Sequence, residues 1–157
     1  LDERTAGLYW SWVGFFSLFS GVRFGALSDI IGRSRGIALV FALQTAAYLL
    51  VGLRLGTGAL MVSIVLYGLA VFAIPAIMAA AMGDYLGLSR AASAFATVTI
   101  FFAIGQAMGP SAAGLIAKAT GSFTSAYLAA GLLTGGAAVL AACLPAPPRM
   151  VRAKSPG

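Results

Sequence analysis

Long apolar stretches along the chain are separated by short polar breaks. The five stretches lie at about 8–27, 36–54, 58–83, 91–117 and 122–144. A helix needs about 20 residues to cross about 30 Å of hydrocarbon, and each stretch has roughly that length or more. Lipid supplies no partner for a free main-chain N–H or C=O group, so we expect each stretch to be a helix. The pattern predicts five membrane-spanning helices joined as antiparallel hairpins.

Composition supports a protein whose surface faces lipid. Hydrophobic residues make up 61% of the chain and charged residues 9%, whereas soluble domains have roughly 45–50% and 25%. The mean hydropathy of +0.98 agrees with this difference. The ten-residue alternation of a barrel strand is absent. We therefore expect an all-α, polytopic membrane helix bundle that has the lipid bilayer as a partner.

Several classes of site are excluded by residue types. The chain has no His and one Cys, Cys143, which lies in an apolar stretch. These numbers exclude internal disulfides, His-based catalysis and any His/Cys metal cluster, and they imply no cofactor. The net charge of +6 comes from basic residues scattered between apolar blocks. A nucleic-acid surface would gather them on one face, so we expect no nucleic-acid partner.

The distribution of Lys and Arg predicts the orientation in the membrane. Seven basic residues fall on one side and three on the other: Arg23, Arg33, Arg35, Arg90, Arg149, Arg152 and Lys154 against Arg4, Arg54 and Lys118. The more basic side faces the cytoplasm. We therefore expect a cytoplasmic C-terminus, cytoplasmic loops at 28–35 and 84–90, and a basic, Pro-rich cytoplasmic tail at 145–157. The expected location is the plasma membrane.

The first polar break carries a motif, Gly25-Ala26-Leu27-Ser28-Asp29-Ile30-Ile31-Gly32-Arg33-Ser34-Arg35-Gly36. Gly25 allows close contact between helices, and Gly32 permits a tight reversal between two spans. Asp29 is an anion at the cytoplasmic mouth, where it can meet an Arg or the N-terminus of a neighbouring helix.

The fourth stretch carries a second motif, from Gly105 through Gly109-Pro110 to Gly114, followed by Gly121-Ser122-Phe123. Pro110 removes a main-chain donor and is expected to bend the helix, and the glycines let a partner pack against the bend. Small residues also recur every four positions, as they do where membrane helices pack closely: Gly105, Gly109, Ala113 and Ala117; Gly21 and Gly25; Gly131 and Gly135. The alternative is the ordinary background of a chain rich in Ala and Gly.

Together the two motifs resemble those of the major facilitator superfamily. The first resembles the Gly-x-Leu-x-Asp-x-x-Gly-Arg signature that follows the second helix of each six-helix half, and the second resembles the segment joining the last two helices. The resemblance covers essentially the whole chain, with the stretch from Pro75 to Phe123 most similar to uncharacterised bacterial members. It therefore implies that the plasma membrane is the inner membrane of a bacterium. It implies that the first motif latches the two halves together in the outward-open state.

The halves of this family are related by an internal repeat, so the stretches could be the second to sixth helices or the eighth to twelfth. The basic tail, the Gly121-Ser122-Phe123 turn and the lack of an Arg in the 58–83 stretch favour the eighth to twelfth. We expect a piece of a longer protein, since the start at Leu1-Asp2-Glu3-Arg4 is unlike a signal peptide. The missing N-terminal half would then be a partner.

The resemblance also implies a solute cavity near the bilayer midplane. The residues that would line it are Trp12, Phe16, Tyr67, Phe72, Phe102 and Gln106, with Pro75 as a kink. For each aromatic ring the alternative is a place in the core or against lipid, and Gln106 could instead bond a neighbouring helix. No charged residue lies mid-span, so a proton-coupling group would belong to the missing half.

The function that follows is secondary-active transport of a small-molecule substrate by alternating access. A non-transporting membrane scaffold or sensor is the alternative. An intramembrane protease is rejected. Met82-Gly83-Asp84 resembles part of an aspartyl-protease motif, but residue 81 is Ala and there is no second intramembrane Asp. A serine protease would need a His.

Overall fold

The computed structural model describes residues 3–145 and 147, and their secondary structure is entirely helical. The seven helices are α1 (Glu3–Ser17), α2 (Ser20–Ile31), α3 (Arg33–Gly52), α4 (Thr57–Ala70), α5 (Ala73–Leu86), α6 (Leu88–Thr120) and α7 (Thr124–Ala142). Their length and apolar composition suit a membrane helix bundle, which confirms the predicted fold class. Residues 146 and 148–157 lie outside the described residues, and most of the predicted basic tail falls there.

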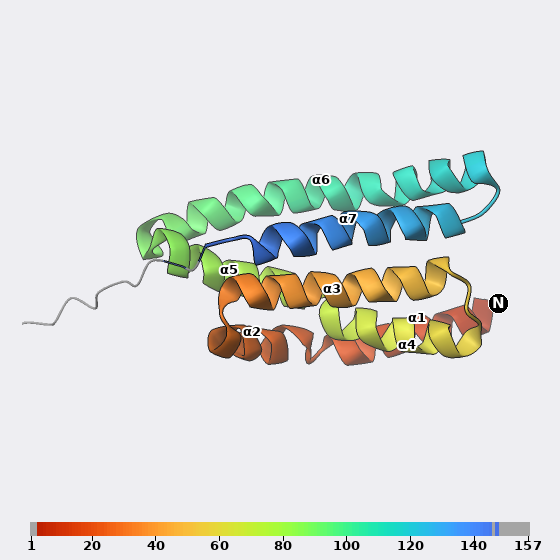
Figure 1. The fold of residues 1–157 in the computed structure, drawn as a ribbon, viewed down its shortest axis with the longest axis horizontal. Coiled ribbons are helices and arrows are strands. Elements are labelled where there is room, and N and C mark those ends of the chain that lie inside the picture. Colours follow the sequence, from red (N-terminus) through yellow and green to blue (C-terminus); the bar gives the residue numbers. More distant parts are fainter. Residues whose placement is uncertain (1–2, 146, 148–157) are drawn as a thin grey trace, which may run out of the picture.

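The helices form an elongated bundle with α3 at its centre (Figure 1). α3 contacts α2, α4, α5 and α7, whereas α6 contacts only α5 and α7. α6 has no buried residue along its whole length. One end of the bundle, here called the motif end, holds the C-terminus of α2 and the N-terminus of α3. The opposite end, here called the tyrosine end, holds the N-termini of α1, α4 and α7.

Two of the predicted continuous stretches are broken. The 8–27 stretch divides at Leu18 and Phe19, where α1 and α2 meet with a bend of 41°. The 58–83 stretch divides at Val71 and Phe72. Pro75, in the first turn of α5, has no N–H to donate to the carbonyl of Val71, so the helical ladder is interrupted there.

Within the described residues, four segments are long and apolar enough to cross a membrane, with α4 and α5 counted as one 30-residue segment. The number rises to five if the bent pair α1–α2 is one span. α6 is a continuous helix of 33 residues that includes Pro110, so the proline does not end the helix.

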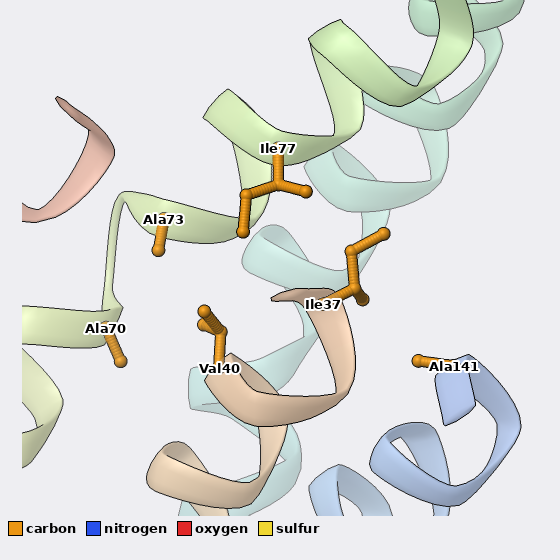
Figure 2. Close-up of a cluster of buried hydrophobic side chains, with 6 residues drawn as sticks. All are labelled: Ile37, Val40, Ala70, Ala73, Ile77 and Ala141. Atoms are coloured by element: carbon orange, nitrogen blue, oxygen red, sulfur yellow. The ribbon is translucent and has the colours of Figure 1, made fainter. Parts of the chain in front are cut away.

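The core lies where α3 faces the break between α4 and α5. Its buried residues are Ile37, Val40, Ala70, Ala73, Ile77 and Ala141. Ala70 and Ala73 stand on either side of the break with Val40 of α3 near them (Figure 2). Alanines at these positions bring the broken helix close to α3, and packing therefore holds together a segment that has lost main-chain hydrogen bonds.

The expected loops at 28–35 and 84–90 are wrong in extent. Helices α2 and α3 are joined by Gly32 alone, and α5 and α6 by Gly87 alone. Gly32 has φ of +96° and Gly87 has φ of +77°, a region that a side chain disfavours. Each reversal therefore takes a single residue, so the charged residues around it lie on helices and are held in fixed positions.

Candidate functional site

Arg33 gathers three polar side chains at the motif end. Its Nε donates to Oδ2 of Asp84 at 2.6 Å, and its Nη2 lies 2.5 Å from Oδ1 of Asp29. Its Nη1 donates to Oγ of Ser28 at 2.6 Å. The Arg33 side chain is only 13% exposed, whereas those of Asp29 and Asp84 are 59% and 45% exposed. One guanidinium therefore ties α2, α3 and α5 together and has its charge balanced on both sides.

The turn at Gly32 sets up this geometry. Ser28 is buried, and its hydroxyl donates to the carbonyl of Gly25 at 2.7 Å while it accepts from Arg33. Gly36 faces Ser28 so closely that an added Cβ would lie 2.6 Å from the Ser28 Cβ. The absence of a side chain at Gly36 therefore lets α3 approach α2, and the approach brings Arg33 within reach of the serine.

The structure bears on two expectations about the first motif. Within this chain it places the close helix contact at another glycine, and of the two partners expected for Asp29 it supplies the Arg. An added Cβ on Gly25 would meet nothing within 4 Å, so the close helix contact is at Gly36 and not at Gly25. The charge partner of Asp29 is Arg33. α2 does not contact α6, so within this chain the N-terminus of α6 is not the partner of Asp29.

Asp84 is the member of the cluster that sequence reasoning missed. It lies 51 positions from Arg33 and was considered only as part of a protease-like motif. Its place at the end of an apolar stretch, on the side that also carries Arg33, was the available signal. Tyr85 beside it donates from its hydroxyl to the carbonyl of Pro145 at 2.6 Å, which joins α5 to the segment after α7.

The six predicted cavity residues do not form one cluster in this chain. Trp12 stacks on Phe16 of the same helix with ring centroids 6.0 Å apart. Phe72 lies at the break between α4 and α5 and is exposed. Phe102 and Gln106 lie on the exposed surface of α6. Tyr67 is the exception, because it lines a cavity.

The glycine motif of α6 is also without contacts in the described chain. An added Cβ at Gly105, Gly109 or Gly114 would meet nothing within 4 Å. By contrast, Gly131 and Gly135 of α7 pack against Leu49 and Thr45 of α3. The small-residue stripe of α7 is therefore used for packing within this bundle, and the two glycines of the α6 stripe, Gly105 and Gly109, are not.

The cavity that Tyr67 lines is at the tyrosine end and has a volume of about 340 Å³. It is lined by Tyr9, Trp10, Val13, Ala47, Tyr48, Val51, Leu60, Ser63, Ile64, Tyr67 and Tyr127. Among the residues the structure describes, no three His, Cys, Asp or Glu side chains come together as metal ligands would.

Comparison with known proteins identifies the family. The family model described as Major Facilitator Superfamily matches residues 1–157. The chain belongs to the major facilitator superfamily. No curated protein and no solved structure gives a significant match. Membership makes the chain part of a multi-pass membrane transporter and not an enzyme, and transporters of this superfamily bind small solutes.

Proposed function

We propose that this chain is the C-terminal half of a secondary-active transporter, and that it moves a small solute by alternating access. In this proposal the described helices are the eighth to twelfth of the full protein. The motif end faces the cytoplasm, as the basic residues favour, and the protein lies in the plasma membrane of a bacterium. The absent N-terminal half packs against this chain and shares the solute cavity.

The observation that carries the proposal is the charge cluster on Arg33. Arg33 lies on α3, and its ionic partners Asp29 and Asp84 lie on α2 and α5. The cluster therefore fixes how these three helices meet at the motif end. Asp29 is 59% exposed after pairing and has a free side for a helix from the other half. A cluster at one end of the bundle can stabilise one of two arrangements of that end without touching the solute.

The size of this effect suits a conformational role. A hydrogen bond to a charged group contributes about 1.5–3 kcal/mol and one between neutral groups about 0.5–1.5 kcal/mol. If a charged hydrogen bond is replaced by a neutral one in only one of two conformational states, the free-energy difference between the two states changes by about 1 kcal/mol. That change alters the population ratio about fivefold, which is enough to slow a transport cycle.

The exposed helix α6 supports a shared cavity. Phe102 and Gln106 stand on a helix with no buried residue, beside glycines at which an added Cβ would meet nothing within 4 Å. Small residues on a membrane helix allow another helix to approach its backbone closely. In the proposal the N-terminal half faces this surface and Gln106 supplies a polar contact to the solute.

Transport of a solute panel by the full-length protein tests the proposal. Cells with and without the gene are compared for solutes taken up or expelled, and transport of any solute found is then measured in liposomes with purified protein. We expect Asp29→Asn to slow this transport while the order of preference among solutes is kept. An unchanged solute profile in the deletion strain, together with altered protein partners, would instead support a scaffold.

A further inference from the structure

The cavity at the tyrosine end shares only Tyr67 with the residues predicted to line the solute cavity, and it lies apart from the α6 surface proposed above to face the solute. Its lining comes from α1, α3, α4 and α7. α6, which carries Phe102 and Gln106, contributes nothing to it, and neither do the residues around Arg33. Its volume of about 340 Å³ falls within the range of roughly 300–1,000 Å³ found for small-molecule sites.

We propose that this cavity is a second ligand site, which takes an uncharged small molecule made of an aromatic ring with one polar substituent. The charge of the ligand follows from the lining, in which no residue is Asp, Glu, Lys or Arg. A charged group that leaves water for such a cavity has no ionic partner, and its transfer is strongly unfavourable. A neutral molecule avoids this loss.

The preference for an aromatic ring follows from the tyrosines. The ring of Tyr48 on α3 lies 5.8 Å from that of Tyr67 on α4 and 6.5 Å from that of Tyr127 on α7, measured between centroids. Three helices thus supply one continuous aromatic surface. Another ring can pack on it edge to face or offset, the arrangements that aromatic pairs prefer.

The polar substituent has partners in the lining. The hydroxyl of Ser63 is already used, since it donates to the carbonyl of Ala47 at 2.8 Å. Tyr127 and Trp10 carry polar ring atoms that make no hydrogen bond within the part of the chain that the structure describes. A hydroxyl on the ligand can bond to either of them, whereas a lipid acyl chain can bond to neither.

Tryptophan fluorescence of the purified full-length protein in detergent tests this site, because Trp10 lines it and Trp12 does not. The probes are 4-bromobenzyl alcohol, 4-bromobenzoate and 4-bromobenzylammonium, which share a quenching ring and differ in charge. The Trp10 signal is the part of the fluorescence that Trp10→Phe removes, and Trp12→Phe provides the matched control. We expect the alcohol to quench the Trp10 signal saturably, with at least tenfold higher affinity than either charged probe.

A second pair of variants tests the position. Leu60 lines the cavity, so Leu60→Phe should fill it and weaken the affinity for the alcohol at least tenfold. Leu132→Phe, on an exposed part of α7 away from the cavity, should leave the affinity unchanged. If Leu60→Phe does not fold, the charge comparison on the unaltered protein still decides the question.

Three results would overturn the proposal. One is quenching by the alcohol that does not saturate, or that affects the Trp12 signal equally, as expected from partition into detergent. Another is equal affinity for the three probes. The third is that a phospholipid brominated in its acyl chain displaces the alcohol and itself quenches the Trp10 signal preferentially. That result would show that the cavity holds lipid. None of these results depends on whether the Arg33 cluster controls transport.

Discussion

Asp84 and Asp29 both pair with Arg33, and replacing Asp84 by Asn distinguishes the contribution of one carboxylate to stability from that of the other. Asp29 lies four positions before Arg33, on the other side of the Gly32 reversal, whereas Asp84 reaches it from α5, 51 positions away. Loss of the Asp84 charge therefore weakens a connection between distant parts of the fold. Loss of the Asp29 charge weakens a local one.

The expected magnitudes follow from exposure and geometry. The amide oxygen in Asp84→Asn can still accept from Nε of Arg33, so the loss is the difference between a charged and a neutral hydrogen bond, about 1 kcal/mol. For Asp29→Asn we expect about 0.5 kcal/mol, because the carboxylate is 59% exposed and solvent screens its ion pair. Arg33→Gln removes the cation that pairs with both carboxylates. Because the Arg33 side chain is only 13% exposed, we expect this substitution to destabilise the protein by about 2–3 kcal/mol.

The assay is thermal unfolding of the full-length protein in detergent, followed by the fraction that remains monodisperse on heating. The midpoint of unfolding should fall most for Arg33→Gln, less for Asp84→Asn and least for Asp29→Asn. A midpoint unchanged by Asp84→Asn, or a larger effect from Asp29→Asn, would show that the bridge to α5 does not stabilise the fold as reasoned here.

Three further outcomes are expected. Gly36→Ala should destabilise the protein by about 1–3 kcal/mol, since its Cβ would lie 2.6 Å from that of Ser28, while Gly25→Ala should be neutral; thermal unfolding of both measures the difference. Gln106→Ala in the full-length protein should change the affinity for the solute or the choice of solute, which binding measurements check. It should change the free energy of unfolding by no more than about 0.5 kcal/mol, which unfolding measurements check. In a Cys143→Ala background, a membrane-impermeant thiol reagent should reach Ser34→Cys only from the cytoplasmic side, and labelling from outside would reverse the proposed topology.

Much of the fold was predictable because lipid imposes a simple rule on the chain. Each of the five apolar stretches coincides with helix, as main-chain groups in hydrocarbon require. The interruptions were less visible. Pro75 signals the one at Val71, but the bend at Leu18 and Phe19 falls within an apolar run with no proline.

The candidate site was predictable only where it is local in sequence. Asp29, Gly32 and Arg33 fall within one motif, and the positive φ of Gly32 agrees with the predicted reversal. The contact from Asp84 depends on how α5 packs beside α2, which no local pattern records. The role of Gly36 in place of Gly25 likewise depends on which face of α2 meets α3. Such choices are made by packing between helices, and periodicity alone does not specify them.

Alternating access is tested most directly by whether two positions on α6, one on each side of Gln106, change their accessibility in opposite directions. Thr99 and Ala113 lie seven residues, about two turns, on either side of Gln106 and near its face of the helix. Cysteines placed there one at a time, in the full-length protein with Cys143→Ala, are labelled with a thiol reagent in the presence and absence of Asp84→Asn. We expect the substitution to speed labelling at Thr99→Cys and to slow it at Ala113→Cys by a similar factor. Rates that move in the same direction, or that do not change, would contradict a cluster that controls which end is open.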